Sequence, residues 1–474
     1  MCVICCGRNM KRLRSELSEL VNRSVDRHVR IAVTGLSRSG KTAFITSLVN
    51  QLLHVHSGAR LPLFSAAREG RLLGAKRIPQ KHFNIPRFAY DEGIAALYHS
   101  PPQWPIPTSG ISEICLQLRY RSQRSLLRHV KETSNLYIEI IDYPGEWLLD
   151  LPMLTQDYFS WSRQMQQLLK GRNNEGAQKW LQLCQQCDPF APADEKLLAN
   201  VAQAYTDYLV FCKQQGLYFI QPGRFILPGD LAGAPVLQFF PWLNIDTTDE
   251  QKLKQADKQS NIGMLQQRYN YYCQKIIKPF YKEYFQHFDR QIVLVDCLTA
   301  LNSGSTAFND MQNALTQIMR SFHYGKRTLL RRIFSPRIDK LLFAASKVDH
   351  ITHDQQANLV SLLQQLVRAA WQNAAFEGIS LDCIALASIQ ATENGMIEYK
   401  GEQLPALKGH RLSDGQLMTF FPGEVPRRLP NVDFWLKQGF DFESFRPCET
   451  ALDQPVAHIR LDSALEFLLG DKLK

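Results

Sequence analysis

Residues 35–42, GLSRSGKT, place two glycines, a lysine and a threonine in the pattern G-x-x-x-x-G-K-[ST]. In such a loop the backbone N–H groups surround a β-phosphate, the lysine bridges β- and γ-phosphate oxygens, and the last hydroxyl ligates Mg²⁺. The preceding VRIAVT is typical of a buried strand, and the following AFITSLVNQLL has helical spacing. The predicted nucleotide contacts are Gly35, Leu36, Ser37, Arg38, Ser39, Gly40, Lys41, Thr42 and Ala43. Lys41 is also the predicted catalytic cation, and Thr42 a predicted Mg²⁺ ligand.

Arg38 is an unusual residue inside this loop. Its long cation either lies against the phosphates as an internal charge stabiliser or points outward to solvent or an acidic neighbour. The outward orientation is favoured, because long charged side chains normally keep their heads in water.

A second motif follows in NLYIEIIDYPGEWLLD, where an alternating apolar segment ends at Asp142 and turns at Pro144 and Gly145. D-x-x-G at a strand end is typical of a γ-phosphate sensor. We predict that Asp142 holds a Mg²⁺-bound water and that the Gly145 N–H binds the γ-phosphate, so that loss of this phosphate frees the following segment. Glu146 stands where many small GTPases have a water-orienting glutamine. It either orients the attacking water or is a surface residue that repels it.

Between these motifs, PPQWPIPTSGISEICLQLRY places a Pro-rich loop before an alternating strand. A loop that closes over Mg²⁺ commonly supplies a threonine from this position. Thr108 is therefore the predicted further metal ligand in the catalytic site, with Ser109 as its alternate. The other interpretation is a proline-stiffened turn with incidental hydroxyls.

The base is predicted to be read in RIDKLLFAASKVDHI, where an apolar strand ends in Ser346-Lys347-Val348-Asp349, similar to [NT]-K-x-D. Asp349 can accept from the ring N–H and the exocyclic amine of guanine, and the Lys347 stem can cover the base. Ser346 replaces the usual Asn or Thr, and its hydroxyl is expected to tie this loop to the phosphate loop. After the strand in LDCIALASIQAT, Ser388 and Ile389 are predicted to offer a backbone N–H to the guanine carbonyl. The predicted ligands are GTP or GDP with Mg²⁺.

Six strand-like segments position these motifs: residues 30–34, 111–120, 136–142, 291–296, 340–346 and 382–388. Four of them carry nucleotide motifs at their carboxyl ends, as expected of a doubly wound sheet that binds ligands at one edge. The predicted fold is therefore α/β, a Ras-like P-loop NTPase core. We expect the second strand to run antiparallel at the edge of the sheet.

The third and fourth strands are separated by a long segment with helical periodicity, where one helix is usual. This segment predicts a large, mainly helical insertion that either moves with the nucleotide state or passively covers the sheet. A terminal amphipathic helix is expected to fold back on the core. The predicted divisions are a leader (1–28), the core (29–150 and 290–395), the helical insertion (151–289) and a C-terminal extension (396–474).

The composition of the 474-residue chain gives weaker constraints. Its net charge of +10 permits anionic partners without identifying one, and the odd number of cysteines, 11, favours reduced thiols. Without an 18-residue apolar run, the chain is expected to be soluble, and reduced thiols are typical of a cytosolic protein. The leader is expected to be solvated, with contact to a membrane surface or a partner as the alternative. The basic segments 119–131 and 323–337 favour solvated faces over nucleic-acid binding.

Taken together, the motifs resemble those of the YcjX family of bacterial P-loop proteins, described as stress-associated GTPases. The resemblance spans essentially the whole chain and rests on GLSRSGKTAFITSLVNQLL, the WP loop, DYPGEWLLDLP, RIDKLLFAASKVDHI and HIRLDSALEFLLGDKL. It implies a cytoplasmic GTP/GDP-binding Ras-like core with a helical insertion, in which residues 35–42 bind phosphate, Asp142 and Gly145 sense the γ-phosphate, and Lys347 and Asp349 read the base. Ser346 and Glu146 depart from common GTPase usage.

The sequence thus predicts a Mg²⁺-dependent GTP-binding switch with slow hydrolysis, in which Lys41 and Mg²⁺ neutralise developing charge and Glu146 or an unknown activator or effector protein orients water. Two alternatives stay open. One is a P-loop ATPase or small-molecule kinase whose insertion is a substrate lid, and the other is a nucleotide-stabilised scaffold that does not hydrolyse.

Overall fold

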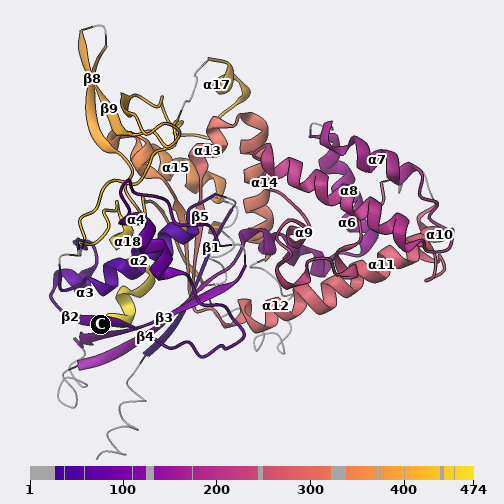
Figure 1. Cartoon of the computed structure of the whole chain (residues 1–474), viewed down its shortest axis with the longest axis horizontal. Coiled ribbons are helices and arrows are strands. Elements are labelled where there is room, and N and C mark those ends of the chain that lie inside the picture. Colours follow the sequence, from indigo (N-terminus) through magenta and orange to yellow (C-terminus); the bar gives the residue numbers. More distant parts are fainter. Residues whose placement is uncertain are drawn as a thin grey trace, which may run out of the picture.

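The computed structural model describes residues 27–474 except 37, 58, 109, 124–132, 173–174, 244–248, 322–337, 369–370, 373–375, 377, 400, 438–441 and 453. Its centre is a seven-stranded sheet with the order β2-β3-β4-β1-β5-β6-β7 (Figure 1). The strands are β1 (Arg27–Gly35), β2 (Leu72–Ile78), β3 (Ser112–Arg121), β4 (Thr133–Asp142), β5 (Arg290–Val295), β6 (Lys340–Ala345) and β7 (Ser380–Ala385).

The sheet confirms the predicted α/β, Ras-like core. The six predicted segments correspond to β1 and to β3 through β7, and only β3 runs antiparallel to the other strands of this sheet. One detail of the prediction is wrong, because β2 lies outside β3 and forms the edge. The sequence of β2, LLGAKRI, escaped prediction because it does not alternate apolar and polar residues and is interrupted by an irregular register at Gly74.

Helices cover both faces of the sheet. Ile31 and Val33 of β1 belong to one apolar cluster with Phe44 of α2 (Lys41–Leu53) and Leu465 of α18 (Leu461–Leu469). On the opposite face lie α13 (Cys297–Asn302), α14 (Ser305–Ser321) and α15 (Gln356–Leu366). The short helices α3 (Ser65–Arg68) and α4 (Tyr90–Leu97) flank the α2 side.

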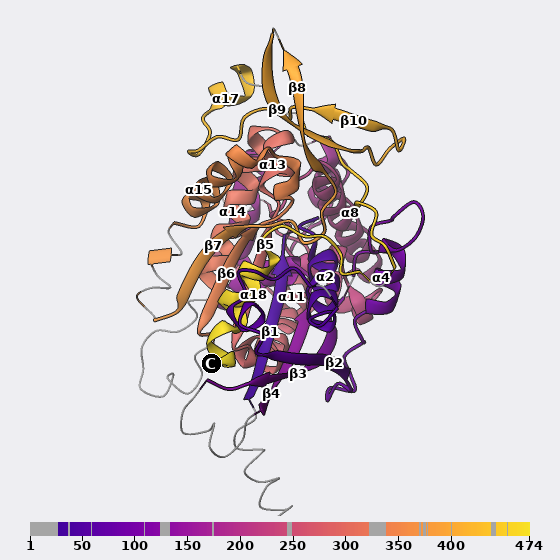
Figure 2. The same ribbon diagram turned by 90° about the vertical axis from the view of Figure 1, so that its left-hand side faces the viewer.

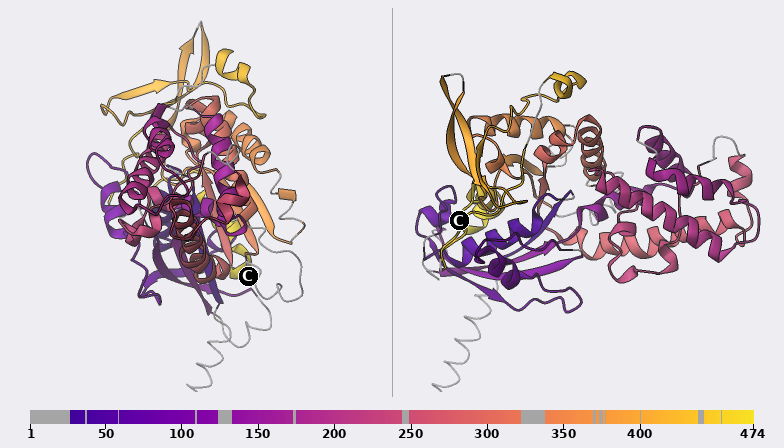
Figure 3. Two further views of the ribbon diagram at one scale, coloured as in Figure 1. Left: turned by 90° about the vertical axis from the view of Figure 1, so that its right-hand side faces the viewer. Right: turned by 45° about the horizontal axis from the view of Figure 1, so that its top comes forward.

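A group of helices lies to one side of the sheet (Figures 1 and 3). It comprises α6 (Tyr158–Lys170), α7 (Gln178–Gln185), α8 (Glu195–Gln214), α9 (Gly223–Ile226), α10 (Glu250–Lys254), α11 (Asn261–Tyr271) and α12 (Lys278–Glu283). Trp161, Trp180 and Tyr205 are fully buried among these helices. Their apolar cluster is continuous with the one beneath β5 and β6, so the helical group and the sheet share a hydrophobic interior.

Beyond β7 the chain forms a three-stranded antiparallel sheet of β8 (Glu393–Tyr399), β9 (Glu402–His410) and β10 (Leu417–Phe420). This small sheet and α17 (Val432–Lys437) stand above the main sheet in Figure 2. The C-terminus then returns to the core, where Asp471 forms ion pairs with Arg290 at 2.6 Å and Lys340 at 2.9 Å. None of the helices in the described part of the chain has the length and apolar character needed to cross a membrane.

Candidate nucleotide-binding site

The phosphate loop joins the end of β1 to the start of α2. Arg38 and Gly40 have φ angles of 63° and 83° there, a left-handed conformation that glycine adopts without strain. The Ser39 N–H donates to the Leu36 carbonyl at 3.2 Å, and the Phe44 N–H to the Gly40 carbonyl at 2.9 Å. The loop therefore delivers the chain directly into the N-terminus of α2, where unpaired backbone N–H groups and the helix dipole favour an anion.

The side chains of this loop differ in exposure. Arg38 is exposed, in agreement with the favoured outward orientation, and Lys41 and Ala43 are half-buried. Ser39 is buried, and its hydroxyl has no hydrogen-bond partner among the described residues. Gly35 has no room for a side chain, since a Cβ would lie 2.7 Å from the Leu294 carbonyl oxygen. Leu36 is buried, and Ser37 lies outside the described residues.

Three predicted metal ligands meet beside this loop. The Thr108 N–H donates to Thr42 Oγ1 at 3.3 Å, and the Thr108 hydroxyl donates to Asp142 Oδ2. Asp142 is only 1% exposed, and its other oxygen has no partner among the described residues. Burial raises the pKa of this carboxyl, against the opposing effects of Lys41 and Thr108. A buried carboxylate with one oxygen that has no partner among the described residues, next to two hydroxyls, fits the all-oxygen ligand preference of Mg²⁺. Ser109, the alternate ligand, lies outside the described residues.

The D-x-x-G turn lies directly against the phosphate loop. It opens a 3₁₀-helical segment, Gly145–Thr155, that we call the switch segment. A Cβ added to Gly145 would overlap the Gly35 carbonyl oxygen, so only glycine permits this approach. The structure thus brings the predicted γ-phosphate sensor next to the predicted phosphate cradle.

Glu146 is not the exposed residue that one interpretation of the sequence expected. It is 5% exposed, and its Oε1 pairs with Lys213 Nζ of α8 at 2.9 Å. Burial works to raise the pKa of Glu146, but the charges of Lys213 and Lys41 outweigh it and the pKa lies below its usual value. Glu146 is therefore an ionised carboxylate held between a helical-insertion lysine and the phosphate-loop lysine.

The predicted base loop follows β6. Ser346 does not reach the phosphate loop as expected, because its hydroxyl faces the Val295 carbonyl of neighbouring β5, 3.5 Å away. Lys347 has a φ of 61°, and its Nζ forms an ion pair with Asp296 Oδ2 at 2.5 Å. Asp296 is fully buried and also accepts from the Thr299 N–H at the start of α13. The Lys347 ammonium is therefore anchored at the end of β5.

Asp349 is buried and already paired. Its Oδ2 accepts from the Ala391 N–H at 2.7 Å, its Oδ1 lies 3.2 Å from His350 Nδ1, and its carbonyl accepts from the Thr392 hydroxyl. The chain between Leu386 and Ala391 contains Ser388 and Ile389, both buried. Since the Val348 N–H also donates to the Leu386 carbonyl, the structure brings the predicted base-reading residues into one loop pair.

Phosphate and base motifs converge because they follow parallel strands. β1, β4, β6 and β7 run in one direction, so the motifs at their carboxyl ends lie at the same edge of the sheet (Figure 1).

Comparison with known proteins agrees with this arrangement of motifs. A model of the YcjX-like family matches residues 29–473. The chain belongs to the YcjX-like family. It is 68% identical over 465 residues to an Escherichia coli (strain K12) protein named Ras-like GTPase YcjX, with 98% of this chain and 100% of the relative covered. It is 45% identical over 482 residues to a protein of the same name from Shewanella oneidensis, covering 98% and 99% respectively. The resemblance inferred from the motifs is confirmed.

In this YcjX-like chain the sequence did not reveal the contacts between the switch segment and the helical insertion. Asp150 accepts from the Gly223 N–H at 2.7 Å and from the Tyr272 hydroxyl at 2.6 Å. Arg224 lies over the Trp147 ring with its guanidinium carbon 3.6 Å from the centroid. Gly223 and Tyr272 are 73 and 122 residues from Asp150 along the chain and belong to no motif. The spacing of residues in the sequence therefore did not predict these contacts.

Three residues at the base end were also missed, namely Asp296, Ala391 and Thr392. Of these three, Asp296 could have been predicted from the sequence, because an acidic residue directly after a buried strand lies at the ligand-binding edge of such a sheet. Ala391 acts through its backbone N–H, which a side-chain pattern does not reveal.

Proposed function

We propose that the protein binds GTP and GDP with Mg²⁺, hydrolyses GTP slowly and acts as a nucleotide-dependent switch. The observation that carries the proposal is a buried Asp142 oxygen, without a partner in the described part of the chain, beside the Thr42 and Thr108 hydroxyls at the phosphate loop. Both relatives of the protein are named Ras-like GTPase, which supports GTP binding and hydrolysis as its activity. A cytoplasmic location and a role in stress stay predictions from the family resemblance.

Bound Mg²⁺ would supply positive charge between the β- and γ-phosphates. Lys41 and the N–H groups at the start of α2 would hold the phosphates, while Thr42, Thr108 and Asp142 would hold the ion. The Gly145 N–H would face the γ-phosphate. Glu146 is paired with Lys213, which restrains its carboxylate and supports slow hydrolysis until an activator or a shift of α8 releases it.

Guanine is the proposed base because Asp349 and Lys347 lie together at the end of β6. Guanine offers two donors to a carboxylate, and adenine leaves the same carboxylate unpaired. The Ala391 N–H occupies one Asp349 oxygen, so guanine has to replace or share this bond.

The test of the base is calorimetric titration of nucleotide-free protein with GDP and with ADP at equal Mg²⁺. We expect GDP to bind at least about a hundredfold more tightly, and Asp349→Asn to lose GDP affinity while gaining affinity for xanthosine diphosphate. Asp414→Asn, an exposed change in the loop between β9 and β10, is the matched control. Equal affinity for GDP and ADP would reject the guanine proposal and favour an ATPase or kinase.

The proposed switch couples the nucleotide to the helical insertion. Lys213, Gly223 and Tyr272 of the insertion contact Glu146 and Asp150, which follow the γ-phosphate sensor directly. Hydrogen exchange across the α6–α12 helices, with GDP and with a non-hydrolysable GTP analogue, tests the coupling. Different protection in the two states is expected, and identical protection would make the insertion a passive cover.

A further inference from the structure

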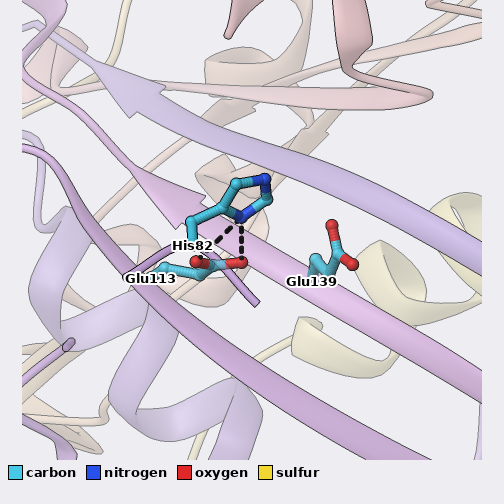
Figure 4. Close-up of side chains that lie close together, drawn as sticks. All are labelled: His82, Glu113 and Glu139. Atoms are coloured by element: carbon cyan, nitrogen blue, oxygen red, sulfur yellow. Dashed lines mark hydrogen bonds and ion pairs between the residues drawn. The ribbon is translucent and has the colours of Figure 1, made fainter. Parts of the chain in front are cut away.

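We propose that His82, Glu113 and Glu139 form a binding site for a divalent transition-metal ion such as Zn²⁺, distinct from the proposed Mg²⁺ site. Their ligand atoms all lie within 4.8 Å of one another (Figure 4). Glu113 is on β3, Glu139 is on β4, and His82 is in the loop after β2. Within the described part of the chain, these three residues are the group of histidine and carboxylate side chains that lie close enough together to hold a metal ion.

The pairing of two strands places both carboxylates on the same face of the sheet. Cys115 of β3 pairs with Glu139 of β4, and Glu113 precedes Cys115 by two residues. Because side chains alternate along a strand, Glu113 and Glu139 project from the face opposite to Ile114 and Ile138, which pack towards α2. The register of β3 and β4 therefore fixes two of the three proposed ligands.

The backbone around His82 fixes the third ligand. Gln80 donates through its side-chain amide to the His82 carbonyl at 2.8 Å. The chain then continues beside the start of β3, where the Phe88 N–H donates to the Glu113 carbonyl at 2.9 Å. The backbone that carries His82 is therefore held next to Glu113 by hydrogen bonds that do not depend on a metal ion, as a preorganised site requires.

Of the three proposed ligands, the Glu113 carboxylate would be stabilised most by a bound cation. Its side chain is 0% exposed, and both of its oxygens lie 3.1 Å from His82 Nδ1. Among the described residues, the other hydrogen bond to its side chain comes from the Cys115 thiol, a weak donor, at 3.5 Å. A buried carboxylate is costly unless a cation or several donors compensate its charge, and an ion bound between Glu113 and His82 would do so.

One carboxylate oxygen of Glu139 is available to bind a metal ion. Glu139 Oε2 accepts from Arg30 at 2.7 Å. Among the described residues, its Oε1 is paired only with the Lys81 ammonium at 3.6 Å, and the Lys81 side chain is 67% exposed. Arg30 can keep its bond and orient the carboxylate, in the way that outer-shell partners support metal ligands. Lys81 can move into solvent and vacate Oε1 for the ion.

The donor set selects the class of ion. One imidazole nitrogen with two carboxylate oxygens suits Zn²⁺ and its neighbours in the first transition series, whereas Mg²⁺ prefers oxygen ligands alone. Zn²⁺ bonds of about 2.0–2.2 Å place tetrahedral ligands about 3.4 Å apart. The His82 to Glu113 separation already approaches that spacing, so only Glu139 has to move inward. His82 is 33% exposed, which leaves room for water as a further ligand.

The proposal is tested by calorimetric titration of the full chain with Zn²⁺, without nucleotide and with excess Mg²⁺. Cys2, Cys5 and Cys6 are changed to Ser in the parent, because these N-terminal thiols would themselves bind Zn²⁺. We expect one Zn²⁺ per chain and at least about a tenfold loss of affinity in Glu113→Gln and in His82→Asn. Glu92→Gln, an exposed change on α4, is the matched control with unchanged binding.

Lys81→Gln gives a prediction of opposite sign. We expect it to tighten Zn²⁺ binding, because it removes the cation that competes for Glu139 Oε1. His82→Asn lies in a loop and keeps the test decisive if Glu113→Gln fails to fold. Absence of Zn²⁺ binding in the parent, or equal binding in the parent and His82→Asn, would overturn the proposal.

Discussion

The phosphate end and the base end of the candidate site share one edge of the sheet but are prepared in different ways. At the phosphate end, Asp142 and Ser39 keep buried oxygens without partners among the described residues. At the base end, Lys347 is paired with Asp296, and Asp349 with the Ala391 N–H. Ligands at the first end relieve an existing cost of burial, whereas a base at the second end has to exchange the existing bond of Asp349, next to a lysine that Asp296 anchors.

Because of this difference, we expect the two ends to contribute differently to nucleotide affinity and selectivity. Charge-assisted bonds to phosphate and metal can use the Asp142 and Ser39 oxygens that have no partner among the described residues, so the phosphate end should provide most of the affinity. The base end gains only the difference between old and new bonds, and should therefore contribute mainly selectivity. The predictions below test this division.

The largest effect is expected from Lys41→Ala. Removing the phosphate-loop cation should weaken GTP and GDP binding by about a hundredfold and abolish phosphate release. Calorimetry and multiple-turnover phosphate release measure both effects, and Lys76→Ala, an exposed change on β2, is the matched control. Release that continues in Lys41→Ala would place hydrolysis elsewhere. A parent that binds GTP tightly without turnover would favour the scaffold alternative.

Asp142→Asn should have two opposite consequences. Burial raises the pKa of Asp142, so a neutral amide should stabilise the nucleotide-free protein against urea. The same change should cancel the gain in GDP affinity that Mg²⁺ provides, which we expect to be about tenfold. Asp91→Asn, whose side chain is 69% exposed, is the control for both measurements. An unchanged Mg²⁺ dependence in Asp142→Asn would contradict its role as the metal-holding carboxylate.

Asp296→Asn should affect the base end alone. The amide oxygen can still cap α13 through the Thr299 N–H, but Lys347 loses its charged partner. We expect about threefold weaker GDP binding and unchanged binding of inorganic triphosphate with Mg²⁺, both measured by calorimetry. Equal losses for the two ligands would show that Asp296 acts on the whole site, and the proposed division between the two ends would fail.

The sequence predicted those parts of the site that depend on local spacing. The phosphate loop, Asp142, Gly145 and the strand before Lys347 are short patterns at strand ends, and the parallel sheet brings them together. The pairing of Glu146 with Lys213 was not predictable, because it joins residues 67 apart through the packing of the helical insertion. The Ser346 hydroxyl was assigned to the wrong neighbour, since its partner depends on β5 lying beside β6.

Asp150 contrasts directly with Asp142, and of the changes considered, Asp150→Asn should affect nucleotide binding least. Both carboxylates are buried, but Asp150 accepts two hydrogen bonds from the helical insertion, and burial raises its pKa from 3.8 to about 6. Between these values the folded protein keeps a proton that the unfolded chain has released. The stability from this protonated group is therefore present below about pH 4 and is lost as the pH rises through about 6.

Asp150→Asn does not titrate, and its amide oxygen can still accept from the Gly223 N–H. The free energy of unfolding of the parent should thus fall relative to that of Asp150→Asn between about pH 4 and 6, then stay level at higher pH. Urea denaturation across this range measures the difference, and Asp230→Asn, an exposed change, is the control. If the parent and Asp150→Asn respond to pH in parallel, Asp150 remains ionised in the folded state. The hydrogen bonds from Tyr272 and Gly223 would then outweigh the effect of burial on the pKa of Asp150.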